Sequence, residues 1–240
     1  MDTNKIVRQH IEMNEFFTGG FAVKTPPAKT KTPTIDQSQP DLSAELKKIA
    51  EEVHSCRKCG LGSIRTNTVP GEGNSKAKIV FVGEAPGADE DAQGRPFVGR
   101  AGQLLDKIIA AVGLKRNDVF ICNILKCRPP DNRDPAAEEI ISCLPYLERQ
   151  LEIINPEIIV ALGAHAAKTL LKTTKPIGQL RGQFQEYYTG IGRAPIKLMP
   201  TYHPAYLLRN YSQDNRKRVW EDMKKVVAEL GLPVPQRNSK

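Results

Sequence analysis

Side chains able to do chemistry come directly after short apolar runs of this sequence. Glu84 follows the run 79–82, Asn123 lies near the end of a second run, and His203 follows a third. In open α/β sheets, ligands bind beyond the carboxyl ends of the strands. Phe97 lies between glycine-containing turns on the loop that begins at Glu84. A carboxylate and an aromatic ring on one loop, joined by side chains from two later strands, predict a crevice for a small flat ligand.

The amide of Asn123 gives this prediction its chemical direction. An asparagine offers a hydrogen-bond donor and an acceptor together, which matches the edge of an amide-like ring. Taken alone, Asn123 is more typical of a residue that caps a loop. The convergence of these side chains at one sheet edge is the stronger evidence, because each by itself is a weak signal.

Five cysteines predict a second site. Cys56 and Cys59 form a CxxC pair, from which two thiolates reach one metal centre, and the two basic residues between them favour the thiolate form. Cys127 and Cys143 complete a plausible four-thiolate set from distant segments. Cys122, inside an apolar run, is interpreted as a small core residue. The spacing leaves zinc, an iron–sulfur cluster and a redox dithiol open.

Alternating strand and helix patterns predict how these residues are positioned. Repeated strand-then-helix units indicate an α/β fold with a central, mostly parallel four-stranded sheet flanked by helices. The predicted strands are 79–82, 118–124, 157–162 and 195–199, and the predicted helices are 42–53, 101–112, 164–171 and 214–230. A further helix is expected to begin near Pro135 and to carry Cys143, and a pair of β segments with a turn at Gly190 is expected within 178–192. His165 is interpreted as a structural or surface residue.

Composition divides the chain into one domain and two tails. Residues 1–40 are poor in apolar side chains after a short possible helix over 1–17, and they are interpreted as a flexible, disordered tail whose partner, if any, is unknown. The folded domain is expected over 41–232, with Asp41 as a helix N-cap, followed by a C-terminal tail over 233–240.

Charge and hydropathy exclude some classes of protein. No run of 18 apolar residues is present, so no membrane span is expected, and the first residues lack a signal-peptide pattern, so we expect a cytoplasmic location. The 35 Lys and Arg residues exceed the 27 Asp and Glu residues, giving a net charge of +8. This excess is compatible with a nucleic-acid partner and is also common in other proteins.

Three motifs carry a resemblance to a known family. The segments GEAPGADEDAQGRPFVGRAGQLLD, NILKCRPPDNRDP and HPAYLLRN resemble the family 4 uracil-DNA glycosylases, over residues 46–230. That family carries a 4Fe–4S cluster. The resemblance implies that the cluster ligands are Cys56, Cys59, Cys127 and Cys143.

The resemblance also assigns roles at the crevice. Uracil would be flipped out of DNA, stacked on Phe97 and read at its N3–H and O4 edge by Asn123. His203 would stabilise the departing uracil through O2, together with backbone amides of the turn from Gly83 to Gly87, which includes Ala85. Glu84 would position water or stabilise the sugar cation. Glu90 matches a second acidic position of the motif and is a further catalytic candidate.

The resemblance implies DNA contacts around the crevice. The basic candidates are Lys126, Arg128, Arg133 and Arg209, for which a solvated surface role is the alternative. Tyr206 or Leu207 would fill the gap left in the duplex. The substrate would be uracil in single- or double-stranded DNA, and the protein is expected to be a monomer. The basic, histidine-containing insertion of a covalently trapping branch is absent after Asn123, so ordinary turnover is expected.

Three functions follow from these patterns. The first is a monofunctional DNA N-glycosylase that leaves an abasic site and so initiates base excision repair, since no lysine is placed for Schiff-base chemistry. The second is a non-catalytic iron–sulfur DNA-binding accessory domain of a polymerase or repair complex. The third is a zinc-stabilised phosphate-binding protein. The intact set of crevice side chains favours the first.

Overall fold

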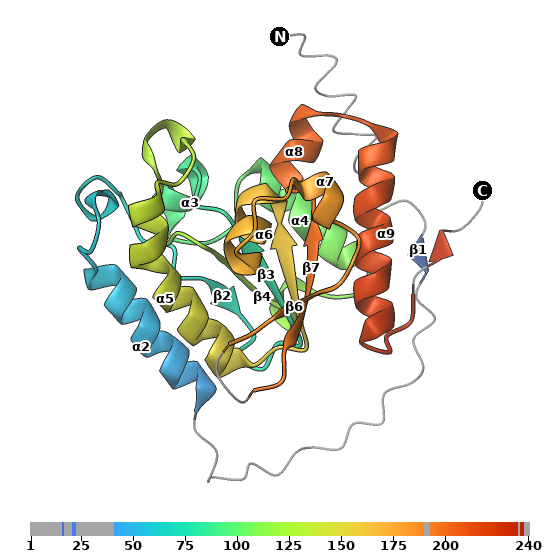
Figure 1. Ribbon diagram of the computed structural model, residues 1–240, viewed down its shortest axis with the longest axis horizontal. Helices are drawn as coiled ribbons and strands as arrows, with labels where there is room; N and C mark the ends of the chain where they lie inside the picture. The colour runs from blue at the N-terminus through green and yellow to red at the C-terminus, as the bar shows by residue number, and fades with distance from the viewer. Residues whose placement is uncertain (1–15, 17–20, 23–40, 190–192, 235, 238–240) are drawn as a thin grey trace.

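A six-stranded sheet forms the centre of the computed structural model, which describes residues 16, 21–22, 41–189, 193–234 and 236–237 (Figure 1). Its strand order is β2-β4-β3-β5-β7-β6. Four strands run parallel, namely β3 (Ile79–Gly83), β4 (Phe120–Asn123), β5 (Ile158–Leu162) and β7 (Ile196–Thr201). Nearly all of their side chains are buried, as expected of a parallel sheet covered on both faces. The predicted α/β fold is confirmed.

Two short antiparallel strands extend the four predicted ones. β2 (Glu72–Gly73) pairs with β4, and β6 (Gln185–Tyr187) pairs with β7. The prediction of four strands missed these edges because elements of two and three residues show no apolar periodicity. Of the two β segments predicted within 178–192, the structure has β6. The first residues of the predicted segment 178–192 belong to helix α7 (Ile177–Leu180), and the turn predicted at Gly190 lies outside the described residues.

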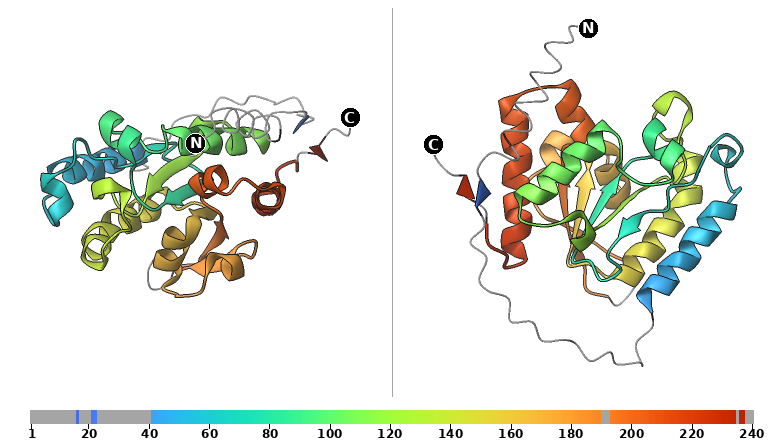
Figure 2. Two further views of the ribbon diagram at one scale, coloured as in Figure 1. Left: turned by 90° about the horizontal axis from the view of Figure 1, so that it is seen from above. Right: turned by 180° about the vertical axis from the view of Figure 1, so that it is seen from behind.

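Helices cover both faces of the sheet (Figures 1 and 2). One face packs against α4 (Arg100–Ala111), α8 (Pro204–Arg209) and α9 (Gln213–Glu229). The other packs against α5 (Ala137–Ile154) and α6 (Gly163–Leu171), and α2 (Leu42–Ser55) lies on α5. Alternate residues of β3 enter the two cores, because side chains on a strand point to opposite faces.

Short elements complete the described chain. They are α3 (Ala88–Gln93), the 3₁₀ turns η1 (Gly60–Ser63), η2 (Arg116–Asp118) and η3 (Pro130–Asn132), and the strand pair β1 (Phe21–Ala22) and β8 (Gln236–Arg237). None of the helices among the described residues is both long and apolar enough to span a membrane.

The predicted helix start at Asp41 is confirmed. Asp41 Oδ1 accepts hydrogen bonds from Ser43 N at 3.0 Å and Ala44 N at 3.3 Å, which satisfies two backbone donors at the beginning of α2. Most of the tail predicted over 1–40, including all but one residue of the possible helix over 1–17, lies outside the described residues, as does half of the C-terminal tail over 233–240. Those predictions stay predictions.

A buried ion pair fastens α9 to the sheet. Asp222, fully buried in α9, accepts a hydrogen bond from Thr201 Oγ1 of β7 at 2.7 Å and pairs with the guanidinium of Arg181. The carboxylate therefore joins three segments that are distant in the sequence.

We expect D222A to lower the free energy of unfolding by about 3–5 kcal/mol, because it leaves Arg181 as an uncompensated, largely buried charge. Urea denaturation followed by circular dichroism measures this. The control is E221A, which removes a half-exposed partner of Lys224 on the same helix and should cost about 1 kcal/mol or less. Equal decreases in the free energy of unfolding for the two variants would contradict the role given to the buried Asp222–Arg181 pair.

Candidate functional site

A cleft opens at the carboxyl ends of the parallel strands. Its volume of about 630 Å³ is in the range of small-molecule sites. The four side chains predicted to form the crevice line it, namely Glu84, Phe97, Asn123 and His203. They come from the ends of β3, β4 and β7 and from the loop before α4, so the predicted convergence at one sheet edge is found.

Asn123 lies at the floor of the cleft and has a hydrogen-bond acceptor that is not used within the described residues. Its side chain is buried, and within the described residues its Oδ1 atom has no hydrogen-bond partner. A buried acceptor without a partner costs about 1–3 kcal/mol, so its retention favours a donor supplied by a ligand. Gly83 leaves the space for it, since a Cβ there would lie 2.3 Å from Oδ1 and 2.6 Å from Cζ of Phe97.

His203 is held in one neutral form. Its Nδ1 accepts a hydrogen bond from Ala205 N at 3.1 Å at the beginning of α8, so the proton of the neutral ring is on Nε2. Burial, with a smaller contribution from the charge of Arg209, lowers the pKa of His203 to about 4. The ring centroid lies 5.6 Å from that of Phe97. The site therefore holds a neutral N–H donor beside an aromatic ring.

Glu84 has two neighbours that the sequence analysis did not assign to the site. Ligand atoms of Glu84, Asp134 and His165 lie within 4.8 Å of one another, and His165 Nε2 is 3.5 Å from Asp134 Oδ2. Burial raises the pKa of Glu84, and the charge of His165 partly offsets this. The side chain of His165, interpreted from the sequence as a structural or surface residue, is 39% exposed and lines the cleft. It follows β5 directly, so the strand-end rule could have found it.

Glu90 has a structural task at the edge of the cleft. Its carboxylate accepts hydrogen bonds from Gly87 N at 3.1 Å, Val98 N at 2.8 Å and Gly99 N at 2.9 Å. These bonds fix the loop that carries Phe97, and the catalytic role predicted for Glu90 stays a prediction. They also occupy the Gly87 amide, one of the turn amides predicted to face the ligand.

The predicted DNA contacts divide into those at the cleft and those away from it. Arg133, Tyr206 and Arg209 line the cleft. Arg128 lies outside its described lining and donates to Asn132 Oδ1 at 2.9 Å.

Two of these predictions were wrong because the side chains are buried. Lys126 is 1% exposed, and its Nζ donates to Asn123 O at 2.9 Å and to Gln150 Oε1 at 2.7 Å. Leu207 is 1% exposed and packs in the core beneath α8, so it is not available to fill a gap in a duplex.

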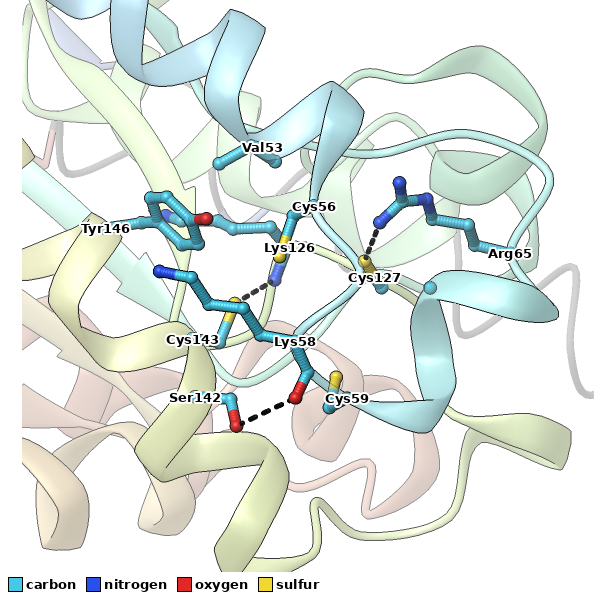
Figure 3. A pocket seen from close by; sticks show the side chains of 11 residues that line it. Val53, Cys56, Lys58, Cys59, Arg65, Lys126, Cys127, Ser142, Cys143 and Tyr146 are labelled. Carbon is cyan, nitrogen blue, oxygen red and sulfur yellow. Dashed lines mark hydrogen bonds between the residues drawn. The ribbon is translucent and has the colours of Figure 1, made fainter.

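The four cysteines predicted as ligands line a second cavity, between α2, α5 and the loop after β4 (Figure 3). N–H donors already point at two of the sulfur atoms. Arg65 Nη1 lies 3.1 Å from Cys127 Sγ, and Lys126 N lies 3.2 Å from Cys143 Sγ. Burial raises the pKa of the Cys143 thiol to about 11. Cys122 is fully buried in the core beside the sheet, as predicted.

The fold and the cleft together define the class of protein to which this chain belongs. A parallel sheet that presents an aromatic ring, a recessed amide and a neutral imidazole at its carboxyl edge is built to bind a planar heterocycle. The chain belongs to the uracil-DNA glycosylase superfamily, whose family model, "Uracil DNA glycosylase superfamily", matches residues 70–224.

Known relatives place it more narrowly, with the type-4 uracil-DNA glycosylases. It is 52% identical to the type-4 uracil-DNA glycosylase of Saccharolobus solfataricus, over 74% of this chain and 83% of the relative. It is 49% identical to that of Archaeoglobus fulgidus, over 79% of this chain and 96% of the relative. A type-5 uracil-DNA glycosylase of Pyrobaculum aerophilum is 32% identical, over 68% and 76% of the two chains.

Because burial disfavours the imidazolium, we expect His203 to stay neutral down to about pH 4. NMR titration of ¹³C-labelled histidine side chains measures this, with H203Q identifying the signal. The signal should not shift between pH 5 and pH 8. A midpoint near the ordinary value of about 6.5 would contradict the expectation.

Proposed function

We propose that this protein is a monofunctional uracil-DNA glycosylase, which removes uracil from DNA and leaves an abasic site. The observation that carries the proposal is the unpartnered Oδ1 of Asn123 at the floor of a cleft walled by Phe97 and His203. A base inside a duplex cannot reach that floor, so the uracil nucleotide must be flipped out or come from a single strand. Arg133, Arg209 and Tyr206 surround the cleft, where they would contact the DNA.

Asn123 selects the base. Its Oδ1 would accept the N3–H of uracil, and its amide N–H would donate to O4. Cytosine presents an acceptor at N3 and a donor at N4, so both contacts would become unfavourable and buried polar groups would stay unpaired. Phe97 adds affinity by stacking, at about 1–3 kcal/mol per base, but does not distinguish pyrimidines.

His203 stabilises the leaving group. As the bond between C1′ and N1 breaks, both bonding electrons leave with uracil, and negative charge spreads onto O2. The Nε2–H of His203 donates to that oxygen, and a neutral donor is suitable because it gains strength as the charge develops without losing its proton to the base.

Glu84 acts on the sugar side. Its carboxylate would stabilise the positive charge that develops on the deoxyribose and orient a water molecule toward C1′. The water oxygen then bonds to C1′ and its proton passes to the carboxylate, which completes hydrolysis. No covalent enzyme intermediate is required, consistent with the monofunctional reaction.

We propose that the four cysteines hold a 4Fe–4S cluster. All four line one cavity, two accept N–H hydrogen bonds, and thiolate sets of this kind hold such clusters. Two sulfurs bound to one zinc ion at about 2.3 Å would lie at most about 4.6 Å apart. Among the described residues no three cysteine sulfurs lie within 4.8 Å of one another. This spacing favours an iron–sulfur cluster over a single zinc ion. When bound, the cluster would supply a structural link between Cys56-Cys59 and the 127–143 segment.

We expect the purified protein to release free uracil from uracil-containing oligonucleotides, and N123A to reduce the single-turnover rate by at least about 100-fold, because recognition of N3–H and O4 is lost. Release is measured by chromatography on single- and double-stranded substrates. N117A, an exposed asparagine on η2, is the matched control and should retain the wild-type rate. DNA binding without release by the wild type would instead support the accessory-domain alternative.

We expect C143A to abolish bound iron and acid-labile sulfide together with absorbance in the visible region, because one of four ligands is lost. C122A should retain both, since Cys122 lies in the apolar core. Elemental analysis and absorption spectra of the two variants show which of the two cysteines is needed to hold the cluster. Zinc without iron in the wild-type protein would overturn the cluster assignment.

A further inference from the structure

Phe97 has an unusual backbone for its residue type. Its φ is 51°, in the left-handed region that non-glycine residues rarely adopt, at a cost of about 1–2 kcal/mol. Its ring is 6% exposed and faces His203 in the cleft. Such a conformation persists only where surrounding contacts hold it. The direction of the stacking ring therefore depends on the groups that bind the Phe97 backbone.

The peptide groups around Phe97 are held from two sides. Glu90 accepts the N–H groups of Val98 and Gly99, which follow Phe97. On the other side, Arg116 donates from Nη2 to Pro96 O at 2.5 Å and from Nη1 to Phe97 O at 3.2 Å. The carboxylate of Glu90 thus binds the N–H donors of the turn 96–99, and the guanidinium of Arg116 binds its carbonyl acceptors.

Arg116 is itself fixed. Its Nε and Nη2 donate to Glu72 Oε1 at 2.9 and 2.8 Å, and its Nη1 donates to Asp106 Oδ1 at 2.7 Å. With the two carbonyls, these contacts make five hydrogen bonds to four acceptor atoms, one bond for each of the five N–H donors of a guanidinium. The side chain is 20% exposed. A lysine, with three donors and no planar fork, cannot make the same set of bonds.

The third constraint is the tight approach of α4. A Cβ at Gly102 would lie 1.9 Å from Phe97 O, so the helix backbone passes directly beside the carbonyl that Arg116 binds. Little space is left for the turn to move, except by releasing the arginine.

We propose that Arg116 is a positioning residue of the glycosylase, which sets the angle of the Phe97 ring by binding the carbonyls of Pro96 and Phe97. The proposal rests on the proposed function, in which Phe97 stacks on the flipped uracil. Arg116 lies on η2, outside the cleft, and acts on the base only through the Phe97 turn.

The test is a double-mutant cycle with R116K and F97A. R116K should lower the single-turnover rate of uracil release about tenfold in the wild-type background, since a small misplacement at the reacting group is costly. It should also raise the inhibition constant of free uracil about tenfold. In the F97A background R116K should change either quantity less than twofold, because the ring through which it acts is gone.

The matched control is R95K. Arg95 binds Glu72 at 2.8 Å, and the same substitution there leaves the acceptors of the Phe97 turn bound to Arg116. R95K should leave rate and inhibition constant unchanged in both backgrounds. E72Q loosens the arginine while keeping the shape of its partner, and should lower the rate about threefold in the wild-type background only. This variant keeps the test decisive if R116K does not fold.

Equal losses from R116K, or from E72Q, in the two backgrounds would overturn the proposal, because a merely structural effect does not depend on the ring. An unchanged rate in both variants would overturn it as well. A wild-type protein without uracil release would instead defeat the proposed function, so the two failures are distinguishable.

Discussion

The site depends on a close approach at Gly83, where β3 ends. A side chain there would collide with both Oδ1 of Asn123 and the ring of Phe97. Only a residue without Cβ lets the amide from β4 and the ring from the loop before α4 meet over one strand end. The recognition and the stacking that we propose for these two side chains therefore share a single steric requirement. The parallel pairing of β3 with β4, which sets Gly83 opposite Asn123, brings the two side chains to that point.

The two sites of the molecule are joined through Lys126. Its Nζ binds the carbonyl of Asn123, and its backbone N–H points at Cys143 Sγ. Lys126 Nζ also donates to Gln150 Oε1, and Gln150 Nε2 donates in turn to Pro70 O at 2.8 Å. The segment from β4 to Cys127 thus reaches from the floor of the cleft to the cysteine cavity. Packing of α2 and α5 around the cysteines supports Asn123, the residue that we propose reads the base.

Much of the fold could be predicted from local patterns. Short, mostly apolar runs identified β3, β4, β5 and β7 because a parallel sheet buries both faces of each strand. Asp41 marked a helix start through its capping preference. The edge strands β2 and β6 were not predictable, because they are too short to carry a pattern and depend on neighbours already in place.

The sequence by itself determined which residue types stand at strand ends, since strand periodicity and strand order in the chain place Glu84, Asn123 and His203 at one edge. Only the tertiary structure decided which groups surround each of them and which of the other candidates are buried. It showed that Glu90 binds backbone amides, that Lys126 and Leu207 are buried, and that His165 joins Glu84. Burial and hydrogen-bond partners arise from segments far apart in the chain, so a reading by local motif cannot supply them.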